Sequence, residues 1–162
     1  MAINRHEMER LIPSLRRFAR GLTGDAQAAD DLVQDALWRA LRKERQFRGD
    51  NLAAWLFAIL ANGARAEVRS RRRQPTVGPL IDTADGGTDP ASRIGILSAL
   101  ASLEAEHREV LLLTAVEGFT YRETAEIVGV PIGTIMSRLA RARDELARRL
   151  DGAPIVPVRR VK

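Results

Sequence analysis

Four arginines stand within five residues near the middle of the chain, and their chemistry is that of phosphate binding. The cluster consists of Arg69, Arg71, Arg72 and Arg73. Guanidinium groups hydrogen-bond to phosphate oxygens and release the counterions that surround nucleic acid. Cations at a helix C-terminus are also favoured by the helix dipole, but four arginines exceed what such a cap requires. The cluster therefore predicts contact with a nucleic-acid backbone.

Two aromatic side chains and an amide precede this cluster on the same segment: Trp55, Phe57 and Asn62. Aromatic rings beside a basic groove can stack on unpaired bases, so the segment is a candidate for binding single-stranded DNA. The alternative for Trp55 and Phe57 is packing in the core, which is favoured when each ring is considered separately.

The C-terminal part of the chain has the spacing of a helix-turn-helix. Ala125, Gly129 and Ile135 provide a small residue in the first helix, a glycine at the turn and an apolar anchor in the second helix. The second helix has a hydrophobic stripe of period 3.6, made of Ile135, Leu139, Ala142, Leu146 and Leu150. Its opposite face carries Thr134, Ser137, Ala140, Arg141, Asp144 and Arg148. Hydroxyl and guanidinium groups suit base and phosphate contacts; the alternative is an ordinary helical hairpin with a solvated face.

A third candidate surface centres on Trp38. The apolar positions around it form one stripe, made of Val33, Ala36, Leu37, Ala40 and Leu41, and the opposite side carries Asp31, Asp35, Trp38 and Arg42. An exposed Trp flanked by charged groups is a common anchor of protein interfaces, and the neighbouring carboxylates disfavour DNA as its partner. The alternative is that Trp38 packs against another helix of its own domain.

Signals for catalysis or cofactor binding are missing from the sequence. It contains no Cys and only His6 and His107, which disfavours thiolate or histidine metal sites. No nucleotide-binding, nucleophile-elbow or zinc-protease motif occurs. We therefore expect a protein that is no enzyme, with no catalytic residue, no metal and no cofactor. Neither a signal peptide nor an apolar run long enough to span a bilayer is found, so we expect a cytoplasmic protein without membrane insertion.

The elements that carry these residues all have helical periodicity, so the predicted fold class is all-α. Helices are expected over residues 4–22, 25–43, 51–73, 93–103, 106–117 and 132–150, with Pro13 a kink or local start in the first of them. A shorter helix should open at Thr120, which with Glu123 has the capping-box spacing.

Domain boundaries are indicated by composition. Residues 75–92 contain three Pro, three Gly and three Asp and are predicted to be a flexible linker. It separates a domain over 1–74 from a second domain over 93–150, which is followed by a basic tail over 151–162. The chain has a net charge of +5, whereas residues 1–74 hold 15 basic and 9 acidic residues, a net +6. The positive charge therefore belongs to the first domain and favours an anionic partner for it.

Three segments in fixed order carry a family resemblance: DDLVQDALWRAL, FRGDNLAAWLFAILANGARAEVRSRRR and FTYRETAEIVGVPIGTIMSRLARARDELARRL. Together with the linker they resemble an extracytoplasmic-function (ECF) sigma factor of bacterial RNA polymerase, of the sigma-70 family, group 4. The lead-in IPSLRRFARGLTGD resembles the general-stress type of alphaproteobacteria. The resemblance implies two helical domains, sigma region 2 and sigma region 4, and a function in promoter-specific transcription initiation.

The resemblance also implies residue roles. The surface that docks core RNA polymerase, at its beta-prime clamp helices, would comprise Asp31, Leu32, Val33, Gln34, Asp35 and Trp38. Recognition of the minus-ten element would fall to Trp55, Asn62, Arg69, Arg71, Arg72 and Arg73. The minus-thirty-five element would be bound by Thr134, Ser137, Arg138 and Arg141. Met136 differs from the family pattern, which often has Lys or Arg at this position.

The implied partners are core RNA polymerase, through its beta-prime clamp helices and beta flap, promoter DNA and an anti-sigma factor. The free protein would be a monomer. Two other functions are considered: a sigma-like decoy that sequesters an anti-sigma factor, and a stand-alone helix-turn-helix regulator. The second does not account for the Trp38 surface.

Overall fold

The computed structural model describes residues 2–71 and 90–150, and within these ranges every regular element is helical. The order is α1 (Arg5–Thr23), α2 (Ala26–Arg42), a 3₁₀ turn η1 (Glu44–Gln46), α3 (Leu52–Arg71), α4 (Pro90–Ser102), α5 (Ala105–Leu111), a π-helical turn η2 (Leu112–Val116), α6 (Tyr121–Val128) and α7 (Ile132–Arg149). The all-α prediction is confirmed. The linker and tail predicted over 75–92 and 151–162 lie outside the described residues, except for residues 90–92.

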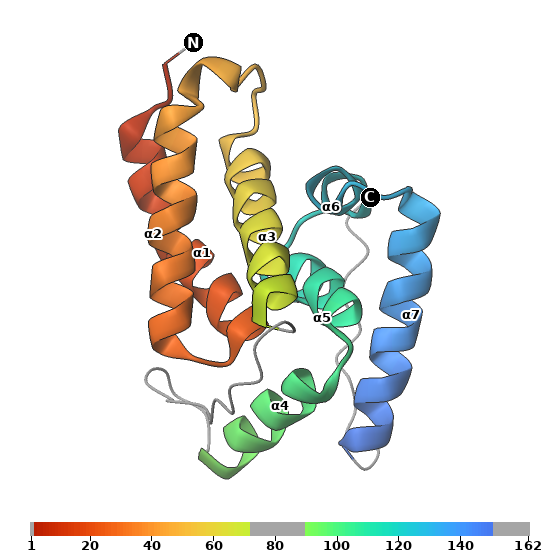
Figure 1. Ribbon diagram of the computed structural model, residues 1–162. Helices are drawn as coiled ribbons and strands as arrows, with labels where there is room; N and C mark the ends of the chain where they lie inside the picture. The colour runs from red at the N-terminus through yellow and green to blue at the C-terminus, as the bar shows by residue number, and fades with distance from the viewer. Residues whose placement is uncertain (1, 72–89, 151–162) are drawn as a thin grey trace.

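The N-terminal bundle consists of α1, α2 and α3 (Figure 1). Local sequence sets its helix ends, because Asn4 and Asp25 accept hydrogen bonds from the first free backbone N–H groups of α1 and α2. Gly24, with φ of 69°, ends α1 in the left-handed region that glycine tolerates best. Helix α1 continues through Pro13, where we expected a kink or a local start. Leu15, Phe18 and Leu56 are fully buried at the centre of this bundle.

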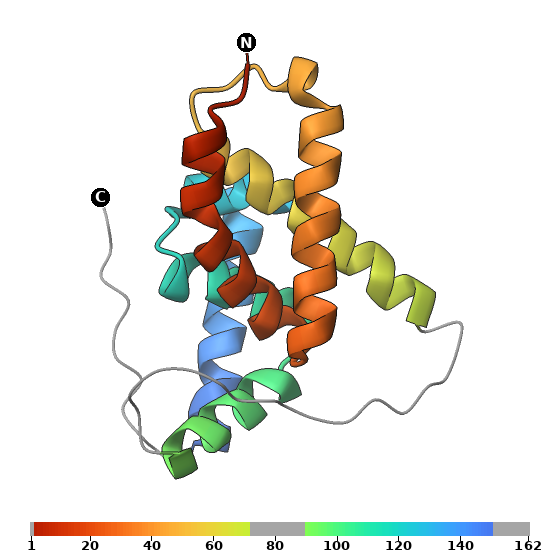
Figure 2. The same ribbon diagram turned by 90° about the vertical axis from the view of Figure 1, so that its left-hand side faces the viewer.

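The C-terminal bundle consists of α4, α5 with η2, α6 and α7 (Figures 1 and 2). Helix α4 begins at Pro90, three residues before the predicted start, and Pro is favoured in the first turn of a helix. The helix predicted over 106–117 ends in the π-helical turn η2. Val110, Leu113, Ile135 and Leu139 form the centre of this bundle.

The two bundles pack directly against each other. Helix α3 lies beside α6, and the C-terminal half of α1 lies beside α4, α5 and η2. Most of the buried apolar side chains of both bundles belong to one continuous hydrophobic core. Phe57 of α3 connects them, because its ring contacts Phe18 at 5.2 Å and Phe119, which precedes α6, at 4.9 Å between centroids. Within the described ranges, no helix combines the length and apolar character needed to cross a membrane.

Candidate nucleic-acid and protein interfaces

The helix-turn-helix is built from α6 and α7. Thr120 and Glu123 form the predicted capping box: the Glu123 N–H donates to Thr120 Oγ1 at 3.2 Å, and the Thr120 N–H donates to Glu123 Oε2 at 2.8 Å. Gly129 ends α6 with φ of 76°, and its N–H donates to the Ala125 carbonyl at 2.8 Å. Ile135 is fully buried at the start of α7. The three positions identified from spacing therefore make the turn.

The outer face of α7 is open to solvent. Ser137 and Arg141 lie on it, one turn apart, and both are exposed. The Ser137 hydroxyl donates to the Thr134 carbonyl at 3.1 Å, and Thr134 itself is half-buried. Arg138 faces α5 instead of solvent: its side chain is 18% exposed, and its guanidinium nitrogen Nη2 lies 3.3 Å from the Glu106 carboxylate oxygen Oε2. Of the predicted minus-thirty-five residues, Ser137 and Arg141 are therefore exposed, and Arg138 would have to leave Glu106 to contact DNA.

The α3 surface combines one half-buried aromatic ring with exposed polar groups. Trp55 is half-buried against Phe47, with ring centroids 5.2 Å apart. Phe57 is only 1% exposed, so it packs in the core, which was the alternative to base stacking, and is not available to bases. Asn62 is exposed and accepts a hydrogen bond from Arg65 at 2.9 Å. Arg69 is exposed near the end of α3, Arg71 is its last residue, and Arg72 and Arg73 lie outside the described residues.

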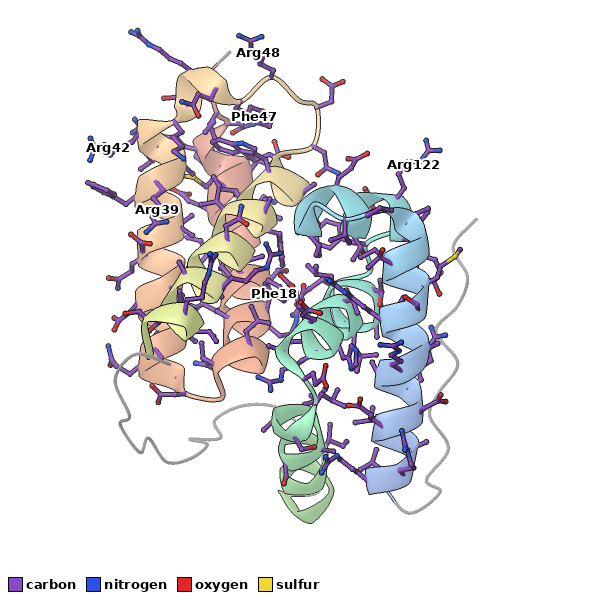
Figure 3. The ribbon with its side chains drawn as sticks, turned by 45° about the vertical axis from the view of Figure 1, so that its right-hand side comes forward. Phe18, Arg39, Arg42, Phe47, Arg48 and Arg122 are labelled. Atoms are coloured by element: carbon purple, nitrogen blue, oxygen red, sulfur yellow. The ribbon has the colours of Figure 1, made fainter. Side chains whose placement is uncertain are left out.

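The Trp38 surface of α2 is exposed as its periodicity predicted. The Trp38 side chain is 56% exposed and contacts the Arg42 guanidinium, 4.5 Å from its ring centroid. Asp35 forms an ion pair with Arg39 at 2.9 Å. Arg39 and Arg42 project outward from α2, away from the other helices (Figure 3).

The structure differs from the prediction at three positions of α2: two residues predicted for the docking surface are buried, and one residue predicted for the buried stripe is exposed. Leu32 and Val33 are buried beneath the exposed Asp31, Gln34 and Trp38, because they face the neighbouring helices. They can support the helix but are not accessible to a partner in this structure. Leu41, which was expected in the buried stripe, is exposed because it lies in the last turn of α2, near the end of the bundle.

The sequence did not predict the polar contacts that the structure shows between the two bundles. Arg65 of α3 donates to Glu109 of α5 at 2.7 Å, and Arg17 of α1 donates to both carboxylate oxygens of Glu117 at 2.8 and 2.9 Å. These partners are 44 and 100 residues apart, and no local pattern links positions so distant. The Arg17–Glu117 hydrogen bond raises the pKa of Arg17.

Arg108 of α5 forms hydrogen bonds to four backbone carbonyls where the two bundles meet. Its guanidinium donates to the Leu22 carbonyl of the N-terminal bundle at 3.0 Å and to three carbonyls before α5: Leu100, Ala101 and Leu103. Burial lowers its pKa. A cavity of about 490 Å³ lies beside it, lined by residues of both bundles that include Leu22, Val68 and Val130.

Glu109 is the buried member of the Arg65–Glu109 pair, with a side chain only 6% exposed. Burial raises the pKa of Glu109, and the hydrogen bond from Arg65 opposes this rise. We expect Arg65→Ala to lower the free energy of unfolding by about 1–3 kcal/mol at pH 8, because it leaves a buried carboxylate without its partner.

The sign of the pH dependence follows from the raised pKa. A protonated Glu109 needs no cation, so the folded R65A protein binds a proton more readily than the unfolded chain, and its stability falls as the pH rises above about 4.3. The loss relative to wild type should therefore be smaller at pH 5 than at pH 8. Urea denaturation at the two pH values measures this, and an equal loss at both would show that Glu109 is not desolvated.

Comparison with known proteins assigns the two bundles. Residues 8–61 match the family described as "Sigma2 domain of PhyR", and residues 93–146 match "Sigma-70, region 4". The architecture is thus that of sigma region 2 followed by sigma region 4. The chain is 42% identical over 156 residues to "ECF RNA polymerase sigma factor EcfG" of Rhodopseudomonas palustris, covering 88% of this chain and 83% of that protein. It is 36% identical over 140 residues to "ECF RNA polymerase sigma factor SigM" of Mycobacterium tuberculosis, covering 84% and 71%.

Solved structures agree with this assignment. The sigma factor RpoE in complex with the anti-sigma factor NepR from Bartonella quintana superposes with a TM-score of 0.83 at 36% identity, over 93% of this chain and 98% of that one. CnrH in complex with the cytosolic domain of CnrY gives 0.69 at 27% identity, over 92% and 88%. The chain belongs to the ECF RNA polymerase sigma factors. The resemblance stated from the sequence is confirmed.

Proposed function

We propose that this sigma factor binds core RNA polymerase through α2 and promoter DNA through α3 and α7. The single observation that carries the proposal is that the Trp38 surface of α2 and the Ser137–Arg141 face of α7 are both exposed, on different bundles. Each surface can therefore meet its own partner. Membership of a family of sigma factors supports polymerase and promoter DNA as these partners.

The α2 surface is proposed to dock the beta-prime clamp helices, and the C-terminal bundle the beta flap. Trp38 provides the apolar anchor, and the exposed Asp31 and Gln34 and the half-buried Asp35 provide polar groups around it. Such an exposed aromatic side chain with a polar rim has the composition of a protein-interface hot spot. Leu32 and Val33 then act from beneath, by holding α2 in place.

The α3 surface is proposed to bind the minus-ten element. Trp55 and Asn62 would contact unpaired bases, and Arg69, with Arg71 to Arg73, would follow the phosphates. Unstacking a base costs a few kcal/mol, which contacts in a pocket can offset. The net charge of +6 on residues 1–74 favours this binding.

The α7 face is proposed to bind the minus-thirty-five element in the major groove. We expect Arg141→Ala to weaken binding of the polymerase holoenzyme to duplex with its preferred upstream element by about 5- to 150-fold, the equivalent of 1–3 kcal/mol. The loss should be small on duplex with a scrambled upstream element. Filter binding with both duplexes measures this, with Arg149→Ala in the last turn of α7 as the matched control. Equal losses on both duplexes would contradict base recognition by Arg141.

An anti-sigma factor is proposed as a further partner. RpoE of Bartonella quintana, whose structure was determined with its anti-sigma factor NepR, shares the arrangement of both bundles with this chain. CnrH supports the same proposal, since it was solved with CnrY. Identity to EcfG also supports the general-stress type suggested by the N-terminal segment.

Run-off transcription with core RNA polymerase, with and without this protein, tests the proposed function. Promoter-dependent initiation that requires the protein is the expected result. A sigma-like decoy would release a sigma factor from its anti-sigma factor without initiating transcription, and a stand-alone regulator would bind DNA without polymerase. Either result, in the absence of initiation, would overturn the proposal. Because action is by binding, no catalytic residue is assigned.

A further inference from the structure

The outer face of α7 has an apolar flank next to its polar one. Ile132 is 45% exposed and Met136, one turn later, is 50% exposed. Ala140 extends the flank by a further turn and is exposed as well. The buried stripe of α7 is made of other residues, so Ile132 and Met136 contribute little to the core of the bundle. Two large apolar side chains exposed in succession on one helix indicate contact with an apolar group of a partner.

The position of Met136 relative to the polar flank limits what that partner can be. Met136 precedes the exposed Ser137 in the chain, and at 100° per residue the two side chains project into one arc of the helix surface together with Ala140. Ala140 and Ser137 lie in the middle of this arc, with Met136 at one edge and Arg141 at the other, so a surface that approaches the middle of the arc meets both Met136 and Arg141. Duplex DNA placed against the polar flank would bring its base edges to the apolar one.

The middle of this face permits close approach. Gly133 lies there, and a Cβ added at this position would meet no atom of the protein within 4 Å. The fold therefore does not require glycine here, although glycine weakens a helix relative to alanine. With Gly133 and Ala140 both small, the backbone of α7 can lie close to a base edge while the longer Met136 and Arg141 side chains reach to either side.

The major-groove edge of the base pairs offers one apolar group, the C5 methyl of thymine. A methionine side chain is flexible and polarisable and packs readily against such a group. We propose that Met136 contacts a thymine methyl in the upstream promoter element and so selects thymine at that position. This inference rests on the proposed function, because it requires that α7 lie in the major groove.

The test uses the full chain assembled with core RNA polymerase. The probe is a promoter duplex selected by this holoenzyme from a random-sequence library, in which each upstream thymine is replaced in turn by deoxyuridine, which lacks only the methyl group. At one position or two adjacent ones, the replacement should weaken binding about fourfold, as expected for one buried methyl group. In Met136→Ala this sensitivity should disappear, and in Met136→Leu it should persist.

Two controls keep the result specific. Val116→Ala removes a side chain of similar exposure, 46%, from η2 of the same bundle and should leave the deoxyuridine sensitivity unchanged. Because Met136 is exposed, a thermal melt of Met136→Ala should coincide with that of wild type.

The outcomes separate the two proposals. If no thymine is sensitive, or the sensitivity survives in Met136→Ala, the role of Met136 is overturned, while a sequence-dependent loss in Arg141→Ala would still uphold promoter binding by α7. If selection yields no upstream element and Arg141→Ala has no effect, then the placement of α7 in the groove fails, and the inference about Met136 fails with it.

Discussion

Replacing Trp38 by alanine is expected to weaken binding to core RNA polymerase by about 30-fold or more, which corresponds to the 2 kcal/mol or more that separates a hot-spot residue from its neighbours. Trp38 is the largest exposed apolar side chain of the α2 surface. A binding partner would remove its ring from water, and no other side chain of that surface has a comparable apolar area.

The same substitution should leave the fold intact. In the free protein Trp38 contacts Arg42 of its own helix, and an exposed cation–π contact is worth about 0.5–1 kcal/mol. The melting temperature should therefore change by a few degrees at most. Asp35→Ala should likewise leave the fold intact, because the ion pair of Asp35 with Arg39 is exposed and contributes little to stability.

Binding of labelled protein to core polymerase, without DNA, measures the effect. Val68→Ala is the matched control, since Val68 is an exposed apolar residue of the neighbouring helix α3 and has no assigned role in docking. If Trp38→Ala and Val68→Ala bind polymerase equally well, the docking role of the α2 surface is wrong.

Replacing Phe57 by alanine is expected to lower the free energy of unfolding by about 3–5 kcal/mol, the range for loss of a buried aromatic ring. Phe57 is among the largest fully buried side chains, and its ring lies between Phe18 and Phe119. The substitution would leave a cavity at the point where the two bundles share their core, and close packing prevents the neighbours from filling it completely.

Urea denaturation followed by tryptophan fluorescence measures this loss, because Trp55 lies two residues away on the same helix. Phe119→Ala is the informative partner variant, because it removes the Phe57–Phe119 ring contact between the bundles but leaves the Phe18–Phe57 contact in place. It should cost less than Phe57→Ala. A loss below about 1 kcal/mol for Phe57→Ala would show that this ring is not packed as the structure places it.

Local features of the interfaces were predictable from the sequence. The capping box of Thr120 and Glu123, the end of α6 at Gly129 and the buried stripe of α7 depend on residues within one or two helical turns. The exposure of Trp38 followed from periodicity in the same way. In each case the physical cause is local backbone geometry, which sequence spacing encodes directly.

Accessibility within each candidate surface was less predictable. The family resemblance grouped Arg138 with Arg141, whereas helical spacing placed only Arg141 on the outer face; in the structure Arg138 lies against Glu106 of α5 and Arg141 faces solvent. Trp55 and Phe57 were equivalent candidates for base stacking, but the neighbouring helices bury Phe57 completely and leave Trp55 half-buried. Which side of a helix is covered depends on helices distant in sequence.

The sequence by itself determined the helices, the helix-turn-helix and the family, because these depend on residue types at short spacings and on motifs in a fixed order. Only the tertiary structure decided that the two bundles share one core around Phe57 and are held by Arg65–Glu109 and Arg17–Glu117. The physical reason is that burial is a property of packing: an arginine at position 65 or 17 has the same local pattern whether it faces water or a carboxylate 44 or 100 residues away.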